Sequence, residues 1–402
     1  MKPIQSLLPK ALAASMVLLC AINFSCGHAG KKPSDAREMT FKVTDSIPLY
    51  NDSLSFRFFD VSRFSKDSIL AFQHPALNLS LLDRKGVFRK NISKKGDLLG
   101  QFIGTFLQPN FSADGYLFVV EDGNTPCISV FDPDLKFVKR IYLNEYIDYD
   151  YVPTLQSTSF VEKNNQGTKI FLSTNTTQYG FSSAELYKRT SSIIEIDLDK
   201  DFNVKGKKRF LPYQSFEKIR SALSENKKDW DSPVAQLAAD PITRSRYVKY
   251  EFDDNLYAYD QNWHLLRTYH VSPPYSGAGY GIPFNQGISD PQKSMETDFK
   301  WRYANIYYYS MDVRDGKAFL LYWKPLPADG IPKNQFEENK VLVTPVLHII
   351  DLKTGKQFYT NLPGKFSPYS HVAALNRKEV MISGNSKTSE DIQLYKLRLA
   401  YE

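Results

Sequence analysis

The stretch Lys95–Leu143 reads KGDLLGQFIGTFLQPNFSADGYLFVVEDGNTPCISVFDPDLKFVKRIYL. It alternates turn-forming segments with apolar ones. Asp, Gly and Pro favour tight turns, whereas aromatic and β-branched residues favour strands. The segments are, in order, an opening at Gly96–Phe102, turns at Pro109 and Asp114-Gly115, strands at Tyr116–Glu121 and Ile128–Phe131, a hairpin turn at Asp132-Pro133-Asp134 and a return strand at Phe137–Leu143. This layout predicts one blade of a β-propeller.

Five other stretches repeat an apolar strand, a variable connection and a second apolar strand. The strand pairs are Ser68–Gln73 with Leu79–Leu82, Lys169–Thr174 with Ile193–Ile196, Tyr247–Phe252 with Leu256–Tyr259, Lys317–Trp323 with Leu347–Ile350, and Glu379–Gly384 with Ile392–Leu399. In five of the six units the second strand ends in Asp, at Asp83, Asp132, Asp197, Asp260 and Asp351. The sequence therefore predicts an all-β fold, a six-bladed β-propeller over residues 38–402.

The sixth unit reaches the C-terminal residues without a return strand. Met39–Val43 (MTFKV) has strand character and no partner in its own neighbourhood. We expect this N-terminal strand to complete the last blade and close the ring, because a closed arrangement leaves no exposed sheet edge.

Two insertions interrupt the repeats. Tyr213–Ala239 has apolar residues at roughly helical spacing, which predicts one or two short helices packed on a blade edge. Ser272–Ser294 is rich in Gly and Pro, which predicts a long loop. Long loops in compact folds often carry function.

The first residues have the pattern of an export signal. Lys2 and Lys10 precede an apolar run, Ala11–Phe24, that is short for a membrane-spanning helix. Ser25-Cys26-Gly27 resembles the bacterial lipoprotein signal, in which the Cys is acylated and becomes the mature N-terminus. The resemblance implies a signal peptide at 1–25, a lipid on Cys26 and a flexible tether at 26–37. Ordinary cleavage near Ala29 and an uncleaved anchor are the alternatives.

The blade quoted above also resembles the NHL-type propeller repeat. The matching residues are Gly100, Phe102, Pro109, Asp114, Gly115, Val120, Asp122, Asn124, Ile128, Val130 and Phe131. With the lipoprotein signal, the whole chain is similar to uncharacterised six-bladed, TolB-like propeller lipoproteins of Bacteroides-type bacteria. This resemblance implies an outer-membrane lipoprotein of the cell envelope. Because no acidic cluster follows Cys26, it favours the side that faces the periplasm.

Composition argues against several classes of function. The 51 basic and 44 acidic residues are interspersed, whereas nucleic-acid binding requires clustered basic residues, so we predict no nucleic-acid partner. Cys127 is the one cysteine in the predicted folded part of the chain, so no disulfide or cysteine zinc site is expected. No histidine pair has a metal-binding spacing. We predict no cofactor.

Three motifs are weighed as catalytic or binding sites and rejected. Asp197–Asp201 alternates acids like a calcium loop, but Phe202 and Lys208 replace the Gly and Glu that such a loop needs, which favours a solvated turn. Gly277–Gly281 is flanked by prolines rather than by a strand and a helix, which favours a flexible loop over a phosphate cradle. No Gly-x-Ser-x-Gly motif occurs. The chain is predicted not to be an enzyme.

Aromatic residues supply the candidate binding site. The run Trp301–Tyr309 is interpreted as a strand whose aromatic side chains mostly fill the core, although it lies beside the Gly/Pro-rich loop. The predicted ligand-binding residues are Tyr275, Tyr280, Phe284 and Trp301. We expect a membrane-anchored, non-catalytic binding or scaffold module whose partner is an envelope protein, a peptide or a glycan. The alternatives are carbohydrate binding in glycan uptake and a propeller hydrolase or lyase with a composite site at the central mouth.

Overall fold

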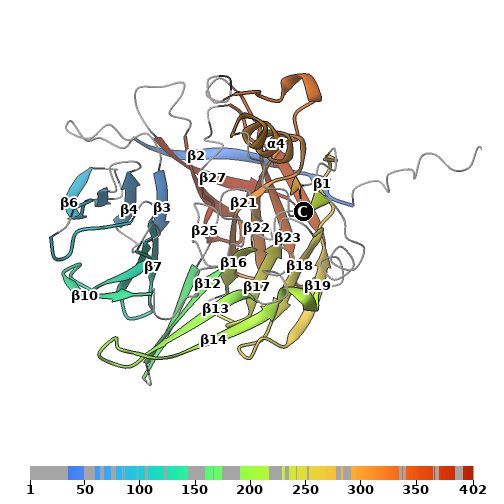
Figure 1. Cartoon of the computed structure of the whole chain (residues 1–402). Coiled ribbons are helices and arrows are strands. Elements are labelled where there is room, and N and C mark those ends of the chain that lie inside the picture. Colours follow the sequence, from blue (N-terminus) through green and yellow to red (C-terminus); the bar gives the residue numbers. More distant parts are fainter. Residues whose placement is uncertain are drawn as a thin grey trace, which may run out of the picture. The chain divides into compact units, whose positions relative to one another are not determined.

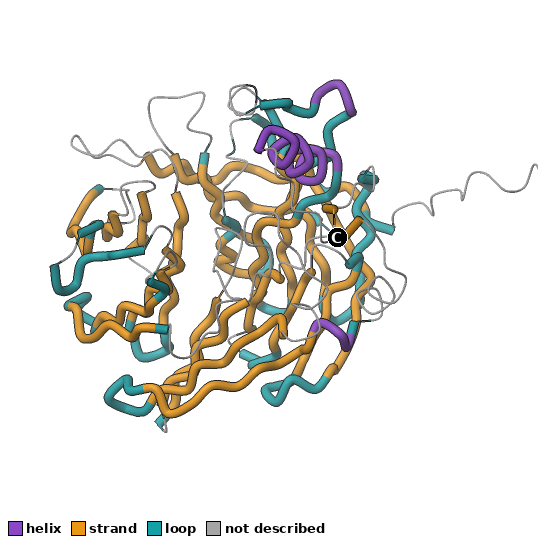
Figure 2. The backbone as a smooth tube through the Cα atoms, viewed as in Figure 1, coloured by secondary structure: helices purple, strands orange, loops and turns teal. Residues whose placement is uncertain are grey.

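The computed structural model describes residues 35–48, 59–63, 68–73, 78–83, 85, 87–96, 98–104, 107–121, 125–143, 159–165, 167–173, 191–216, 229–230, 235–240, 242–250, 253–277, 282–283, 291–334, 337, 341–364, 366, 371–384 and 393–401. Everything from Ala36 onward belongs to one compact unit. Figure 2 shows that strands dominate the described residues of this unit. None of its described helices is long and apolar enough to cross a membrane.

The described strands form six antiparallel sheets and a two-stranded ribbon (Figure 1). The first three sheets are β3 to β6 (Phe59–Arg63, Ser68–Gln73, Asn78–Asp83, Phe88–Ser93), β7 to β10 (Leu107–Phe111, Leu117–Glu121, Cys127–Phe131, Phe137–Tyr142) and β11 to β14 (Ser159–Asn164, Gly167–Ser173, Ser191–Leu198, Val204–Pro212). The fourth and fifth are β16 to β19 (Ala235–Ala239, Arg246–Tyr250, Asn255–Tyr259, Leu265–His270) and β21 to β24 (Tyr308–Arg314, Lys317–Trp323, Pro345–Asp351, Gln357–Asn361). The sixth joins β25 (Ala373–Asn376), β26 (Glu379–Ser383) and β27 (Gln393–Ala400) to β2 (Thr40–Pro48), and the ribbon pairs β15 (Asp229–Trp230) with β20 (Ile282–Pro283).

From the second sheet to the sixth, the first strand of each sheet contacts the first strand of the next, and the first strand of the sixth contacts that of the first. These contacts join β7 to β11, β11 to β16, β16 to β21, β21 to β25, and β25 to β3. Sheets that meet through their first strands and present their fourth strands outward form a β-propeller. The sequence prediction of a β-propeller is confirmed.

The predicted N-terminal closing strand is also confirmed. β2 pairs antiparallel with β27, from Thr40 opposite Ala400 to Pro48 opposite Gln393. β1 (Arg37–Glu38) adds a short parallel pair to β24 in the preceding sheet. The two ends of the described unit are therefore held in one sheet by main-chain hydrogen bonds.

In five of the six sheets an aspartate at or just after the end of the third strand builds a similar turn. Asp260 illustrates it, because its Oδ1 accepts the backbone N–H groups of Asn262 (2.7 Å) and His264 (2.8 Å). Asp83, Asp132 and Asp351 make equivalent bonds. In the third sheet the turn residue is Asp199 rather than the predicted Asp197, because the strand continues to Leu198.

A large apolar residue with positive φ follows three of these aspartates. Leu135, Phe202 and Trp263 each stand three positions after the Asp, with φ between 59° and 65°. All three are buried, and Trp263 packs against Phe171 and Phe210 of the preceding sheet. The left-handed conformation is costly for such residues. Here it directs each side chain into the interface with the neighbouring sheet.

Two local predictions are corrected and a third is corrected only in part. Pro109 lies within the edge strand β7 rather than in a turn; an edge position tolerates Pro because its missing N–H leaves no ladder bond unmade. The one or two short helices expected within Tyr213–Ala239 stay a prediction for residues 217–228 and 231–234, which lie outside the described residues, whereas Tyr213–Ser215 is a 3-10 turn and Ala235–Ala239 is strand β16. The N-terminal half of the predicted strand Trp301–Tyr309 belongs to the helix α4, Pro291–Ala304.

The helix α4 has a pattern that could have predicted it. Met295, Phe299 and Tyr303 are spaced by four, and all three pack on the same hydrophobic cluster. Pro291 at the first helical position is favourable because that N–H has no partner inside a helix. The aromatic run that continues to Tyr309 obscured this spacing.

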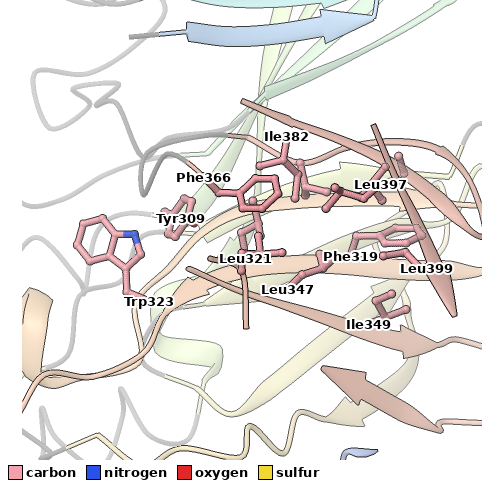
Figure 3. Packing of buried hydrophobic residues seen from close by; sticks show 14 of the residues in the cluster. Tyr309, Phe319, Leu321, Trp323, Leu347, Ile349, Phe366, Ile382, Leu397 and Leu399 are labelled. Atoms are coloured by element: carbon pink, nitrogen blue, oxygen red, sulfur yellow. The ribbon is translucent and has the colours of Figure 1, made fainter. Parts of the chain in front are cut away.

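The largest described hydrophobic cluster lies between the fifth and sixth sheets. Figure 3 shows Phe319, Leu321 and Leu347 facing Ile382 and Leu397. Trp323, at the end of β22, stacks on Tyr303 of α4 with ring centroids 5.3 Å apart. The prediction that most aromatic side chains of 301–309 fill the core is confirmed for Tyr303, Tyr307, Tyr308 and Tyr309, which are buried.

Candidate functional site

Tyr275 lies where the chain leaves the fourth sheet and crosses the fifth. Its hydroxyl donates a 2.7 Å hydrogen bond to Oδ1 of Asn361, and its ring meets Tyr359 edge-on at 6.4 Å. The Lys324 ammonium lies 4.9 Å from the ring centroid. Tyr275 is half-buried, so this group combines an aromatic ring, an amide and a cation at a surface position. We call Tyr275, Lys324, Tyr359 and Asn361 the Tyr275 platform.

The other predicted site residues are less well placed. Tyr280, Phe284 and the predicted lipid-attachment residue Cys26 lie outside the described residues. The backbone of Trp301 belongs to α4, and its side chain is outside the described part. The structure therefore places one of the four predicted ligand-binding side chains, Tyr275.

A buried polar network lies in the interface between the fourth and fifth sheets. Gln357 on β24 donates from Nε2 to the carbonyl of His270 (2.6 Å), and its Oε1 accepts the N–H of Ser272 (2.9 Å). These two backbone partners fix the orientation of the amide. His348 Nε2 lies 2.9 Å from the same Oε1, so Nε2 must carry the proton.

His348 is a neutral imidazole, because burial disfavours its charged form. Burial lowers the pKa of His348 to about 4, and the nearby Lys249 charge adds to the effect although the bond to Gln357 opposes it. Its Nδ1 has no hydrogen-bond partner among the described residues. The Tyr322 hydroxyl is likewise buried without a described partner, and the two rings are 6.2 Å apart.

Lys249 extends the network toward the fourth sheet. It is fully buried on β17, and its ammonium donates to the carbonyls of Tyr250 (2.7 Å) and Asp253. The same ammonium lies 4.1 Å from the ring centroid of Tyr308, which in turn packs on Tyr322 at 5.2 Å. Lys249, Tyr308, Tyr322, His348 and Gln357 thus form a continuous row, which we call the polar seam.

Sequence analysis did not predict the polar seam. His348 and Lys249 stand inside apolar strand segments, PVLHIID and RYVKY, where a polar residue would have been the signal. A buried Lys or His within a strand needs a hydrogen-bonding partner, since burial of an unpaired polar or charged group is costly.

Polar side chains also join neighbouring sheets at or near their first strands. The pairs are Asn110 Nδ2 to Ser159 Oγ (2.7 Å), Arg246 Nη2 to Glu162 Oε2 (2.7 Å), Val372 N to Ser310 Oγ (3.0 Å) and Ala374 N to Asp312 Oδ2 (2.7 Å). Arg246 is buried and also lies 4.1 Å from the Phe171 ring centroid. The described carboxylates of these pairs are therefore engaged in contacts between sheets.

The motifs interpreted as structural keep that role. Asp199 bonds its own turn through Asp201 and Asn203, as a solvated turn requires. Cys127 is free and buried, and burial raises the pKa of its thiol far above the usual value. Among the described residues, no group of three or more His, Cys, Asp or Glu could hold a metal ion.

These contacts define a β-propeller whose blades are joined by hydrophobic clusters and by buried polar bonds. No protein-family model matches the chain. No curated protein matches its sequence.

Solved structures with a similar fold include proteins from Bacteroides. A member of the DUF4221 family from Bacteroides vulgatus aligns with a TM-score of 0.67 and 13% identity over 91% of this chain and 99% of that one. A structural genomics protein of unknown function from Bacteroides thetaiotaomicron aligns with a TM-score of 0.44 and 9% identity over 92% and 75%. A catalytically inactive virginiamycin B lyase from Staphylococcus aureus gives 0.44 and 9% over 90% and 100%. The first supports the fold alone, and the other two do not bear on function.

Proposed function

We propose that the chain is a six-bladed propeller lipoprotein, anchored through Cys26, that acts as a non-catalytic binding or scaffold module of the cell envelope. Each of the six sheets is one blade of the proposed ring. The export-signal pattern of residues 1–25 and the tether at 26–37 support anchoring at the outer membrane, on the side that faces the periplasm.

One observation carries the non-catalytic part of the proposal. Charged side chains at two described sheet interfaces make structural contacts: Arg246 holds Glu162, and Asp312 accepts the N–H of Ala374. His348 is neutral, buried and oriented by Gln357. Groups committed to holding blades together are poorly suited to proton transfer or nucleophilic attack, which need access to a substrate.

The anchoring and the scaffold role are tested together. The tagged full-length protein is extracted from membranes of a producing bacterium, and co-purified proteins are identified by mass spectrometry, with Cys26→Ala as the control. We expect incorporation of a labelled fatty acid into the wild type and a stable partner that is lost in the variant. Unchanged acylation in Cys26→Ala would show that Cys26 is not the lipid-attachment residue. The absence of any partner would shift the proposal to a soluble ligand.

The Tyr275 platform favours carbohydrate as a second candidate ligand. Aromatic rings stack on the apolar face of sugars, and an amide such as Asn361 bonds hydroxyl groups. The row of Tyr275, Tyr280, Phe284 and Trp301 would then form one binding face. Oligosaccharide binding is measured by tryptophan fluorescence and a glycan array, with each of the four residues changed to Ala.

A matched control separates this site from the general loss of an aromatic ring. Tyr142 on β10 is 52% exposed and lies in a different sheet, so Tyr142→Ala should leave binding unchanged. Binding that survives all four alanine changes would overturn the site. The third candidate is a hydrolase or lyase at the central mouth. It predicts turnover of a bound glycan, which would be detected as a product released from the oligosaccharide.

A further inference from the structure

The outer edge of the first two sheets exposes apolar side chains among basic ones. Leu98 and Leu99 are 69% and 86% exposed, the latter being the most exposed large apolar side chain among the described residues. The other exposed apolar members are Val87, Phe88 and Val138. The exposed basic members are Lys85, Arg89, Lys90, Lys94, Lys95 and Lys136. We call these residues the basic apolar edge.

Specific contacts make this edge one surface. The Lys90 ammonium, on β6, donates to the carbonyl of Asp134, in the turn before β10 (3.0 Å). The Arg140 guanidinium, on β10, donates to the carbonyl of Gln101. Gly100 lies directly against the Phe137 side chain. The strand β6, the connection 94–101 and the strand β10 are therefore held side by side, at the left of Figure 1.

The charge of the segment is of one sign. Between Asp83 and Asp97 the sequence contains six basic residues and no acidic one: Arg84, Lys85, Arg89, Lys90, Lys94 and Lys95. Arg89 is paired with Asp83 at 2.6 Å, but no described acid lies within ion-pair distance of Lys94 or Lys95. Leu98 and Leu99 follow those lysines after Gly96 and Asp97, in a turn closed by the Gln101 N–H on the Leu98 carbonyl (3.0 Å).

We propose that the basic apolar edge docks on the surface of an anionic lipid bilayer. Protruding leucines on a surface that also carries exposed lysines can enter the headgroup region while the ammonium groups meet lipid phosphates. The surface is a turn and the outward side of an edge strand. A turn of this kind inserts into a deformable bilayer without needing a matching groove. Docking would orient the propeller with its first two sheets against the membrane, whatever attaches the chain to it.

A second copy of the chain is a poorer occupant of this surface. Pairing of two β6 edges would bring two sets of lysines together, and like charges on an edge oppose such pairing. An acidic protein has the right charge, but it would not draw the leucines into an apolar environment deeper than the headgroups. The depth that Leu98 reaches therefore separates the two partners.

The test places a probe on Leu98. The full-length Leu98→Cys chain is labelled with an environment-sensitive fluorophore and reconstituted into vesicles of phosphatidylcholine with or without phosphatidylglycerol. We expect a blue shift, and quenching by nitroxide-labelled lipid, in the anionic vesicles. Adding Lys94→Glu and Lys95→Glu should weaken insertion, because each cation near an anionic surface strengthens binding about fivefold.

Two controls make the result decisive. Leu342 is 72% exposed elsewhere in the chain, so the labelled Leu342→Cys chain should report no insertion, and the unsubstituted labelled chain gives the background. Lys205→Glu with Lys208→Glu makes the same charge change on β14 and should leave insertion at Leu98 intact. Equal signals at Leu98 and Leu342, no quenching at Leu98, or no dependence on the anionic lipid would each overturn the proposal, and thermal unfolding checks that every variant folds.

Discussion

The two faces of the sheet β21 to β24 are built in different ways. Toward the sixth sheet the face is apolar and aromatic, with Phe319, Leu321 and Trp323 of β22 in one continuous cluster (Figure 3). Toward the fourth sheet a second hydrophobic cluster, which includes Leu320 and Tyr322, is interrupted by the polar side chain of His348. Successive residues of β22 therefore contribute to two different interfaces, because their side chains point to opposite faces of the sheet.

The difference shows what each kind of interface contributes. An apolar interface gains free energy from burial but tolerates small shifts, because the hydrophobic effect has no direction. The polar seam makes bonds with fixed geometry, such as Gln357 to the backbone of His270 and Ser272. We infer that the apolar face provides most of the stability and that the polar seam sets how the fourth and fifth sheets align.

The apolar face should give the largest effect on stability. Trp323→Ala removes a buried side chain that contacts Tyr303, Tyr307 and Tyr309, and should lower the free energy of unfolding by about 3–5 kcal/mol. Chemical denaturation measures the change. Leu342→Ala, at an exposed position, should stay within about 0.5 kcal/mol of wild type. A loss below about 1 kcal/mol at Trp323 would contradict the assignment of stability to this face.

The polar seam should make stability depend on pH. The folded pKa of His348 is about 4, below the value of about 6.5 in an unfolded chain, so the unfolded state binds more protons between these values. The stabilising contribution is complete above about pH 6.5 and is lost as the pH falls to 4, by about 3 kcal/mol. Thermal unfolding of wild type and His348→Gln between pH 7 and 4.5 measures it. If the two chains lose stability in parallel, His348 is not the group responsible.

The turn at Asp351 holds the end of β23 in the sheet β21 to β24, so a substitution of Asp351 should affect the stability of both faces of that sheet. Burial would raise the pKa of Asp351, but hydrogen bonds from Lys317 and Thr354 outweigh it and hold the pKa at about 2. Asp351→Ala should cost about 1–2 kcal/mol. The wild-type contribution should disappear as the pH falls from about 4 to 2. Urea titrations of both chains at pH 7 and pH 3 test this, and an equal deficit at both values would argue against the carboxylate.

The smallest effect is expected at the Tyr322 hydroxyl. It has no described hydrogen-bond partner, so Tyr322→Phe should be neutral or stabilising by up to about 1 kcal/mol. Tyr250→Phe is the matched control, because the Tyr250 hydroxyl lies 2.6 Å from Ser192 Oγ and its loss should cost about 1 kcal/mol. Equilibrium unfolding compares them. A destabilised Tyr322→Phe chain would mean that a bridging water completes the polar seam.

Much of the strand layout could be predicted because it depends on local chemistry. The predicted strands Ser68–Gln73 and Lys317–Trp323 have the observed bounds, and the turns at Asp132, Asp260 and Asp351 are where Asp was expected to form them. Turn residues act on the next few peptide groups, so their effect is visible in a short window of sequence.

The candidate site was predictable only in part. Tyr275 was expected at a binding face, and its place beside Tyr359 and Asn361 depends on residues more than 80 positions away. The helix α4 was missed because an aromatic run masked the spacing of Met295, Phe299 and Tyr303. The polar seam was missed because its members are single polar residues within apolar strands.

The sequence by itself determined most of the strand pairs and Asp turns. It also determined that an N-terminal strand, predicted at Met39–Val43 and observed at Thr40–Pro48, completes the last sheet, because these features follow from period-two patterning and turn chemistry. Only the tertiary structure decided which face of β22 meets which neighbour, and that His348 and Lys249 are buried in one interface. The physical reason is that both faces of a propeller strand are buried. A nearly continuous apolar sequence then carries no mark of which side each residue will face.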